Sequence, residues 1–188
     1  MRTIEELIDD LQDAAQADAA RQSLIQAGRE AVMPLLARLS QAEPKQCWQI
    51  INILAKLRDP RAVPAVSEFL LAENGALRVA AAQCLGEIGH RSAIVPLLRA
   101  LEPNRCYGAL VWIVQALGRL GDSRATEPLL ALMQETDSAA VRYTTIEALG
   151  LIGDLRAVEP IEQCLDDDSH HVRDRAQTAL ARLRTALA

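Results

Sequence analysis

The stretch Leu149-Gly-Leu-Ile-Gly-Asp-Leu-Arg-Ala-Val-Glu-Pro160 decides the fold, because two variants of it occur earlier in the same chain. They are Leu85-Gly-Glu-Ile-Gly-His-Arg-Ser-Ala-Ile-Val-Pro96 and Leu117-Gly-Arg-Leu-Gly-Asp-Ser-Arg-Ala-Thr-Glu-Pro128, so the phrase recurs every 32 residues. A repeat of this length has the size of one helical hairpin, which buries its apolar face only by stacking on its neighbours. The sequence therefore predicts an all-α protein, a right-handed α-solenoid of about six antiparallel helical hairpins.

The repeat extends through most of the chain, although its copies are degenerate. The expected hairpins cover residues 4–26, 30–57, 61–88, 92–120, 124–152 and 156–186. Thr3 and Glu6 have the spacing of a capping box, so the first helix is expected to begin there. Three second helices are followed by a glycine, at Gly89, Gly121 and Gly153, where a left-handed cap is favoured.

No linker longer than a few residues separates these hairpins, so a single solenoid domain is expected over residues 1–188. Residues 1–29 are expected to form an N-terminal capping hairpin and residues 30–155 the central repeats. Residues 156–188 are expected to form a C-terminal capping hairpin, because the outer side of this segment is polar, as a terminal cap requires.

The composition narrows the class of protein. Half of the 188 residues are apolar but only five are aromatic, so Leu, Ile, Val and Ala must build the core. The absence of a long apolar run and of a charged leader predicts a cytoplasmic protein without membrane insertion. A net charge of -5 disfavours nucleic acid as a partner, since such binding usually needs a basic stripe. The four cysteines lack C-x-x-C spacing and are expected to be reduced.

The second helix of each hairpin carries a polar row and an aromatic row on the side that the helical period turns away from the core. One interpretation is that the aromatic side chains fold over the neighbouring hairpin and complete the core. The other is an apolar groove for a protein segment or a flat ligand, because Trp and Tyr supply much contact area at low entropy cost. The candidate groove residues are Trp48, Asn52, Val79, Gln83, Tyr107, Val111, Trp112, Gln115, Tyr143 and Glu147.

Covariation between the turns and the second helices predicts three structural ion pairs. The predicted pairs are Asp59 with Arg78, Asp122 with Arg142, and Asp154 with Arg173. Where His90 replaces the aspartate, Leu110 replaces the arginine, and a turn that lacks the aspartate is followed by Cys47. Charge and partner disappear together, which favours a largely desolvated ion pair between turn and helix.

A search for chemistry yields no catalytic residue, no metal site and no resident cofactor. His170 and His171 are adjacent, so on a helix their side chains diverge by about 100° and are not expected to share a metal. Cys47 and Cys106 have no base near them in the sequence, so neither is expected to act as a nucleophile.

The segments Ala80-Ala-Ala-Gln-Cys-Leu-Gly-Glu-Ile-Gly89 and Val141-Arg-Tyr-Thr-Thr-Ile-Glu-Ala-Leu-Gly-Leu-Ile-Gly-Asp-Leu-Arg-Ala-Val-Glu-Pro160 resemble HEAT repeats of the short prokaryotic type, often called phycobilisome-lyase HEAT-like repeats. The resemblance covers residues 30–186 and implies an α-solenoid. Such repeats occur in subunits of phycobilin lyases, which attach bilins to phycobiliprotein cysteines or remove them, and in many scaffolds without enzymatic activity. This chain shows no separate lyase signature.

These observations predict a non-catalytic scaffold or adaptor that binds a protein partner on the concave face of the solenoid. The resemblance implies an alternative, a phycobilin lyase or chaperone-type subunit that acts on phycobiliproteins with a second HEAT-repeat subunit and holds an open-chain tetrapyrrole transiently. A third possibility is a structural subunit that assembles through its ends, which the polar last hairpin disfavours.

Overall fold

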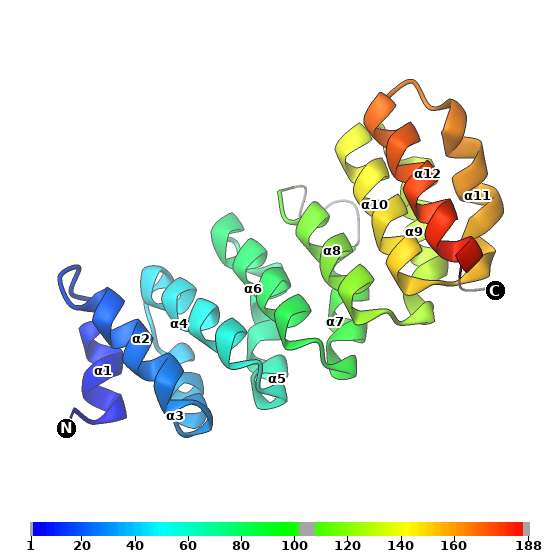
Figure 1. The fold of residues 1–188 in the computed structure, drawn as a ribbon. Helices are drawn as coiled ribbons and strands as arrows, with labels where there is room; N and C mark the ends of the chain where they lie inside the picture. Colours follow the sequence, from blue (N-terminus) through cyan, green and yellow to red (C-terminus); the bar gives the residue numbers. More distant parts are fainter. Residues whose placement is uncertain (1, 102–107, 186–188) are drawn as a thin grey trace. The chain divides into compact units, whose positions relative to one another are not determined.

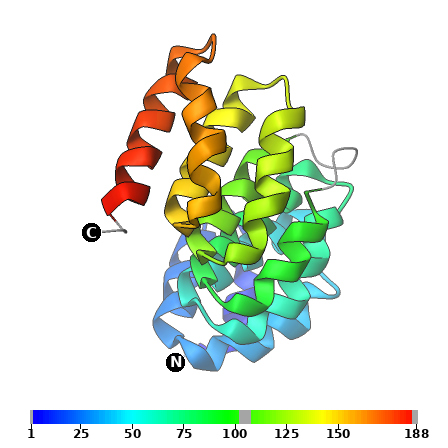
Figure 2. The same ribbon diagram turned by 90° about the vertical axis from the view of Figure 1, so that its right-hand side faces the viewer.

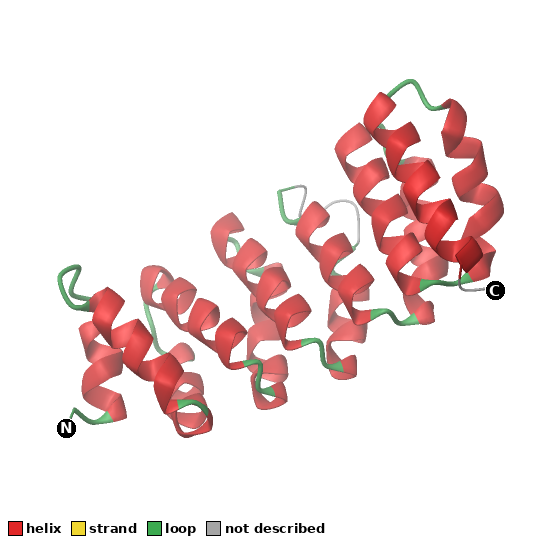
Figure 3. Ribbon diagram, in the orientation of Figure 1, coloured by secondary structure: helices red, strands yellow, loops and turns green. Residues whose placement is uncertain are grey.

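The computed structural model describes residues 2–101 and 108–185, and in these ranges the chain contains helices and no strand (Figure 3). It divides into two compact units, Met1–Ala93 and Ile94–Ala188, which are considered separately. Within each unit, antiparallel helical hairpins follow one another in chain order (Figure 1). The predicted all-α class and the helical hairpins are therefore confirmed, while the single domain over residues 1–188 stays a prediction.

The first unit begins with a hairpin of α1 (Ile4–Asp10) and α2 (Ala17–Ala27). The second hairpin is α3 (Arg29–Leu39) and α4 (Pro44–Leu57). In the third, the first arm is η1 (Pro60–Ala62), α5 (Val63–Ser67) and η2 (Glu68–Leu71), and the second arm is α6 (Gly75–Ile88). The short η3 (Arg91–Ala93) ends the unit. The second helices pack in order, α2 on α4 and α4 on α6.

The second unit has the same plan. Its first hairpin is α7 (Ile94–Arg99) with α8 (Leu110–Leu120). The next is η4 (Ser123–Ala125) and α9 (Thr126–Glu135) with α10 (Ala139–Ile152). The last is η5 (Leu155–Ala157), α11 (Val158–Gln163) and η6 (Cys164–Asp166) with α12 (His170–Thr185), and Figure 2 shows α11 beside α12. Here α10 packs on α8 and on α12.

The ends of the second helices follow the predicted caps. Gly89, Gly121 and Gly153 have positive φ angles of 67°, 65° and 78°, and the backbone N–H of each donates to the carbonyl of the leucine four residues earlier. At the end of α4 the equivalent residue is Arg58, which adopts a φ of 51° although it has a side chain. A left-handed conformation costs a non-glycine residue free energy, so this cap is strained.

Glycines inside the second helices allow these helices to approach one another. A Cβ atom placed on Gly118 of α8 would lie 2.8 Å from the Cα atom of Ala148, and one on Gly150 of α10 would lie 2.9 Å from the Cβ atom of Ala179. The leucines that precede the repeat glycines, such as Leu149, are fully buried. In the phrases that begin at Leu117 and Leu149, the first glycine therefore serves helix packing and the second serves the helix cap.

Candidate functional site

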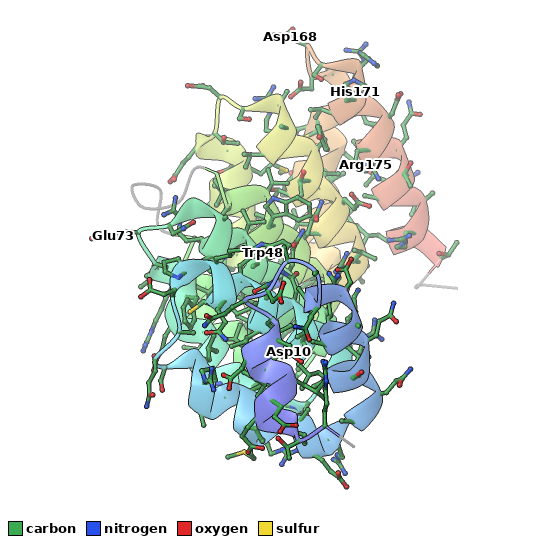
Figure 4. The ribbon with its side chains drawn as sticks, turned by 90° about the vertical axis from the view of Figure 1, so that its left-hand side faces the viewer. Asp10, Trp48, Glu73, Asp168, His171 and Arg175 are labelled. Atoms are coloured by element: carbon green, nitrogen blue, oxygen red, sulfur yellow. The ribbon has the colours of Figure 1, made fainter. Side chains whose placement is uncertain are left out.

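The second helices of the first unit place the predicted groove residues at their surface. Trp48 is 45% exposed and projects from α4 (Figure 4), whereas Asn52, Val79 and Gln83 are half-buried. The Asn52 side-chain amide donates to the Trp48 carbonyl oxygen at 2.7 Å, which fixes the two residues relative to one another. Trp48 is therefore not a core residue, while the polar row lies deeper than the helical period predicts.

A small pocket lies between α2 and α4, and we call it the α2–α4 pocket. It has a volume of about 190 Å³ and is lined by Leu11, Ala17, Asp18, Arg21, Trp48, Gln49 and Asn52. Asp18 forms an ion pair with Arg21 one turn along α2, yet the carboxylate side chain remains 85% exposed. The Gln49 Oε1 atom is buried and has no hydrogen-bond partner. The pocket thus combines one large aromatic face with carboxylate and amide groups.

In the second unit, a pocket lies between α8 and α10 and another between α10 and α12. The pocket between α8 and α10 has a volume of about 150 Å³ and is lined by Gln115, Arg119, Thr144, Glu147, Ala148 and Leu151. The α10–α12 pocket, of about 480 Å³, is lined by Tyr143, His171, Asp174, Arg175 and Thr178. The Arg175 Nη1 atom lies 3.1 Å from the Glu147 Oε1 atom, so an ion pair links α10 and α12 beside the pocket.

Aromatic rings form one wall of the α10–α12 pocket. The ring centroids of Tyr143 and His171 are 6.3 Å apart, and those of His170 and His171 are 3.8 Å apart with an interplanar angle of 38°. The two imidazoles therefore lie closer than an angle of about 100° along a helix suggests, because ring position also depends on the side-chain torsions. Figure 4 shows His171 and Arg175 one turn apart on α12.

The remaining groove candidates differ in exposure. Trp112 is 36% exposed, and Val111, Gln115, Tyr143 and Glu147 are half-buried. Tyr107 lies outside the described residues. The pockets bring together five of the predicted residues, Trp48, Asn52, Gln115, Tyr143 and Glu147. Whether these residues bind a partner stays a prediction.

The sequence reasoning missed the groups that the neighbouring helices add to these pockets. Asp18 and Arg21 come from α2, and Asp174 and Arg175 come from α12. The sequence predicts capping hairpins for both segments and names no groove residue on either. Alignment of the repeats indicates Asp174 as a groove residue, since it occupies in α12 the position that Tyr143 occupies in α10.

The three predicted ion pairs are wrong, because each aspartate binds an arginine two residues later. Asp59 accepts hydrogen bonds from Arg61 Nε at 2.9 Å and Nη2 at 2.8 Å, and Asp122 and Asp154 are bound in the same way by Arg124 and Arg156. Each carboxylate also accepts the backbone N–H of its arginine and so caps the 3-10 turn. Hydrogen bonds from the arginine side chains lower the pKa of Asp59 and of Asp154 to about 2.

The arginines assigned to those pairs, Arg78, Arg142 and Arg173, hold the loop at the other end of the hairpin. Arg78 Nη1 donates to the carbonyls of Ala72 and Glu73, and Arg173 Nη1 to those of Asp167 and Asp168. Arg142 donates to the Thr136 carbonyl and forms a two-point ion pair with Asp167. In an antiparallel hairpin the starts of the two helices lie at opposite ends, on the order of 18 Å apart for a first arm of this length. The predicted partners therefore cannot meet.

One hairpin of the first unit replaces the loop-binding arginine with a cysteine. Cys47 occupies the position of the loop-binding arginines, and its thiol donates to the carbonyls of Ala42 at 3.2 Å and Leu39 at 3.7 Å. A short side chain thus performs the capping function where the loop lies close to the helix.

Three of the four cysteines can be assessed as nucleophiles, because Cys106 lies outside the described residues. Burial raises the pKa of the Cys84 thiol to about 12 and also raises the pKa values of Cys47 and Cys164. A thiolate is the reactive form of cysteine, so these three residues are poor nucleophiles. Among the described residues, no three His, Cys, Asp or Glu side chains converge as metal ligands would, and no helix has the length and apolar character needed to span a membrane.

Comparison with known proteins gives the repeats a family. A family model of HEAT repeats matches residues 32–107 and 109–181, which together make up most of the sequence. The chain belongs to the HEAT-repeat family. The resemblance seen in the repeat phrases is therefore confirmed, and no curated protein matches the sequence of this HEAT-repeat protein.

Solved structures share the fold of this HEAT-repeat protein over nearly its whole length. A designed armadillo repeat protein in complex with the peptide (KR)4 has a TM-score of 0.68 at 17% identity, over 97% of this chain and 100% of that chain. The complex of CpcE and CpcF of phycocyanin lyase from Nostoc sp. PCC7120 has a TM-score of 0.55 at 20% identity, over 97% and 95%. Human deoxyhypusine hydroxylase in complex with glycerol has a TM-score of 0.57 at 24% identity, over 97% and 74%.

Proposed function

We propose that this HEAT-repeat protein is a non-catalytic scaffold of the cytoplasm that binds an extended segment of a protein partner across the adjacent second helices within a unit. The observation that carries the proposal is the series of pockets between adjacent second helices, one in the first unit and two in the second. Two of them are smaller than 200 Å³, well below the range of about 300 to 1,000 Å³ that is usual for a whole compact ligand. Pockets of this size suit single side chains.

The spacing of the helices supports an extended ligand. Packed helices lie about 8 to 10 Å apart, and an extended chain advances about 3.3 Å per residue. A segment that crosses neighbouring second helices therefore presents one side chain to each successive pocket about every three residues. Exposed tryptophan beside such pockets adds contact area at low entropy cost.

An open-chain tetrapyrrole is the alternative ligand, and a phycobiliprotein with a second HEAT-repeat subunit the alternative set of partners. Sites for ligands of this size are mostly apolar. The α10–α12 pocket, the largest of those between second helices, is instead lined by five polar side chains, Tyr143, His171, Asp174, Arg175 and Thr178. This lining favours a protein segment over a pigment.

Truncation of the exposed aromatics tests the proposal. We expect Trp48→Ala to leave Tm nearly unchanged and to weaken capture of the partner by about 2 kcal/mol, the loss typical of a central anchor. Met33→Ala is the matched control, because Met33 is 56% exposed on α3, away from the second helices. The measurement is a pull-down with quantitative mass spectrometry, accompanied by thermal melts.

The contrary results are distinct. Destabilisation by about 3 kcal/mol or more would show that Trp48 mainly stabilises the fold, although the residue is 45% exposed. Equal capture of the partner by the Trp48 and Met33 variants would show that α4 is not part of the binding face. An absorbance shift of phycocyanobilin on addition of the purified chain, lost in the Tyr143→Ala variant, would favour the tetrapyrrole instead.

A further inference from the structure

We propose that the α2–α4 pocket and the α10–α12 pocket, each considered by itself, bind a cationic side chain, lysine or arginine, of a protein partner. This proposal rests on the proposed function. The two pockets lie in different units but share one composition. Each combines an aromatic ring from one second helix with an aspartate and an arginine from the adjacent second helix. The partner residues that enter either pocket are therefore basic.

In the α2–α4 pocket, Trp48 provides the aromatic face and Asp18 the carboxylate. The ion pair with Arg21 neutralises the charge of Asp18 but leaves its side chain 85% exposed, and a carboxylate accepts several hydrogen bonds. An incoming guanidinium can share this carboxylate while its alkyl stem covers the exposed Trp48 ring. An acidic side chain would gain neither contact.

In the α10–α12 pocket, the rings of Tyr143 and His171 provide the aromatic wall, and Asp174 is exposed on α12. The Arg175 charge is balanced by Glu147 at 3.1 Å, so the three charged side chains sum to −1. A cation on the ring faces gains both the ring quadrupole and the carboxylate, whereas an apolar side chain would desolvate Asp174 without compensation.

Asp174 is the one carboxylate among the residues that line the α10–α12 pocket. Two neighbouring arginines have other partners, because Asp167 holds Arg142 and Arg173 is bound to loop carbonyls.

Labelled peptides of defined charge test the proposal on the full chain. We compare (Arg-Ser)4, (Gln-Ser)4 and (Glu-Ser)4 by fluorescence anisotropy at about 150 mM salt, where distant charges are screened. The arginine peptide is expected to bind at least about tenfold more tightly than the other two. Asp174→Asn and Asp18→Asn should each weaken it about fivefold. Glu135→Gln removes the same charge from α9, outside the pockets, and should have no effect.

The aromatic wall has its own test. Tyr143→Phe, which retains the ring, should bind the arginine peptide as the parent does, whereas Tyr143→Leu should bind it more weakly.

The proposal is overturned if the glutamine peptide binds as tightly as the arginine peptide, if Glu135→Gln weakens binding as much as Asp174→Asn, or if the arginine peptide does not bind at about 1 mM. None of these results affects the capture assay. If capture of the partner is still lost in the Trp48→Ala variant, the scaffold function stands and only the proposal of cationic side chains is rejected.

Discussion

Replacement of Gly150 by alanine tests whether helix packing overrides helix propensity. Alanine stabilises an exposed helix by about 1 kcal/mol relative to glycine. At Gly150 of α10, however, the new methyl group would lie 2.9 Å from the Cβ atom and 3.1 Å from the Cα atom of Ala179 on α12. Carbon atoms in ordinary contact are about 3.5 to 4.0 Å apart, so α10 and α12 must separate by several tenths of an ångström.

The magnitude follows from these opposing terms. Overpacking of this kind usually costs about 1 to 3 kcal/mol, and the gain in propensity offsets part of it. We expect Gly150→Ala to lower the free energy of unfolding by about 1 to 2 kcal/mol, measured by urea denaturation and followed by far-UV circular dichroism. Gly75→Ala is the control, because a methyl group there would meet only the Arg78 guanidinium, at 3.4 Å.

A double-mutant cycle identifies the contact. Ala179→Gly removes the methyl group that Gly150→Ala would strike, so the double variant should be more stable than the sum of the two single changes predicts. A Gly150→Ala variant that is more stable than the parent would refute the close approach of α10 and α12. Additive effects would show that Ala179 is not the neighbour that matters.

Three further predictions concern the helix ends and loops. Arg58→Gly should raise the free energy of unfolding by about 1 kcal/mol in urea denaturation, since it relieves a φ of 51°. Asp59 and Asp154 have folded-state pKa values of about 2, below the value of about 3.9 in the unfolded chain. Each carboxylate therefore stabilises the fold by about 1 to 2 kcal/mol above about pH 4, and this stabilisation is lost as the pH falls towards 2. Asp59→Asn should flatten the pH dependence of Tm in acid titrations. Arg142→Leu and Asp167→Asn should show a coupling energy of about 1 kcal/mol, and a coupling near zero would contradict the ion pair between α10 and the loop before α12.

The fold could be predicted from the sequence because helix caps and buried positions depend on residues that are close along the chain. The positive φ of Gly121 and the burial of Leu117 follow from neighbours along one helix, and the 32-residue period repeats them. The partner of Asp122 was assigned incorrectly for a related reason. Covariation reports that two positions change together but does not say at which end of an antiparallel hairpin each one lies.

Only part of the candidate site could be predicted from the sequence. Trp48 and Tyr143 were identified because the helical period places them away from the core. Asp18 and Asp174 were missed, since a pocket between two helices depends on which faces of both helices meet, and the repeat phrase describes one helix at a time. The depth of Asn52 has the same origin, because the neighbouring helix covers it partly.

The thiol that caps the loop before α4 gives the first unit a built-in reporter of local opening. Cys47 is buried and bound to two carbonyls, so a thiol reagent can modify it only when the loop between α3 and α4 detaches. Cys84 lies in the middle of α6 with no exposed surface, and its modification requires a larger part of the unit to unfold. The ratio of the two labelling rates therefore measures how far the loop opens independently of the helices that it joins.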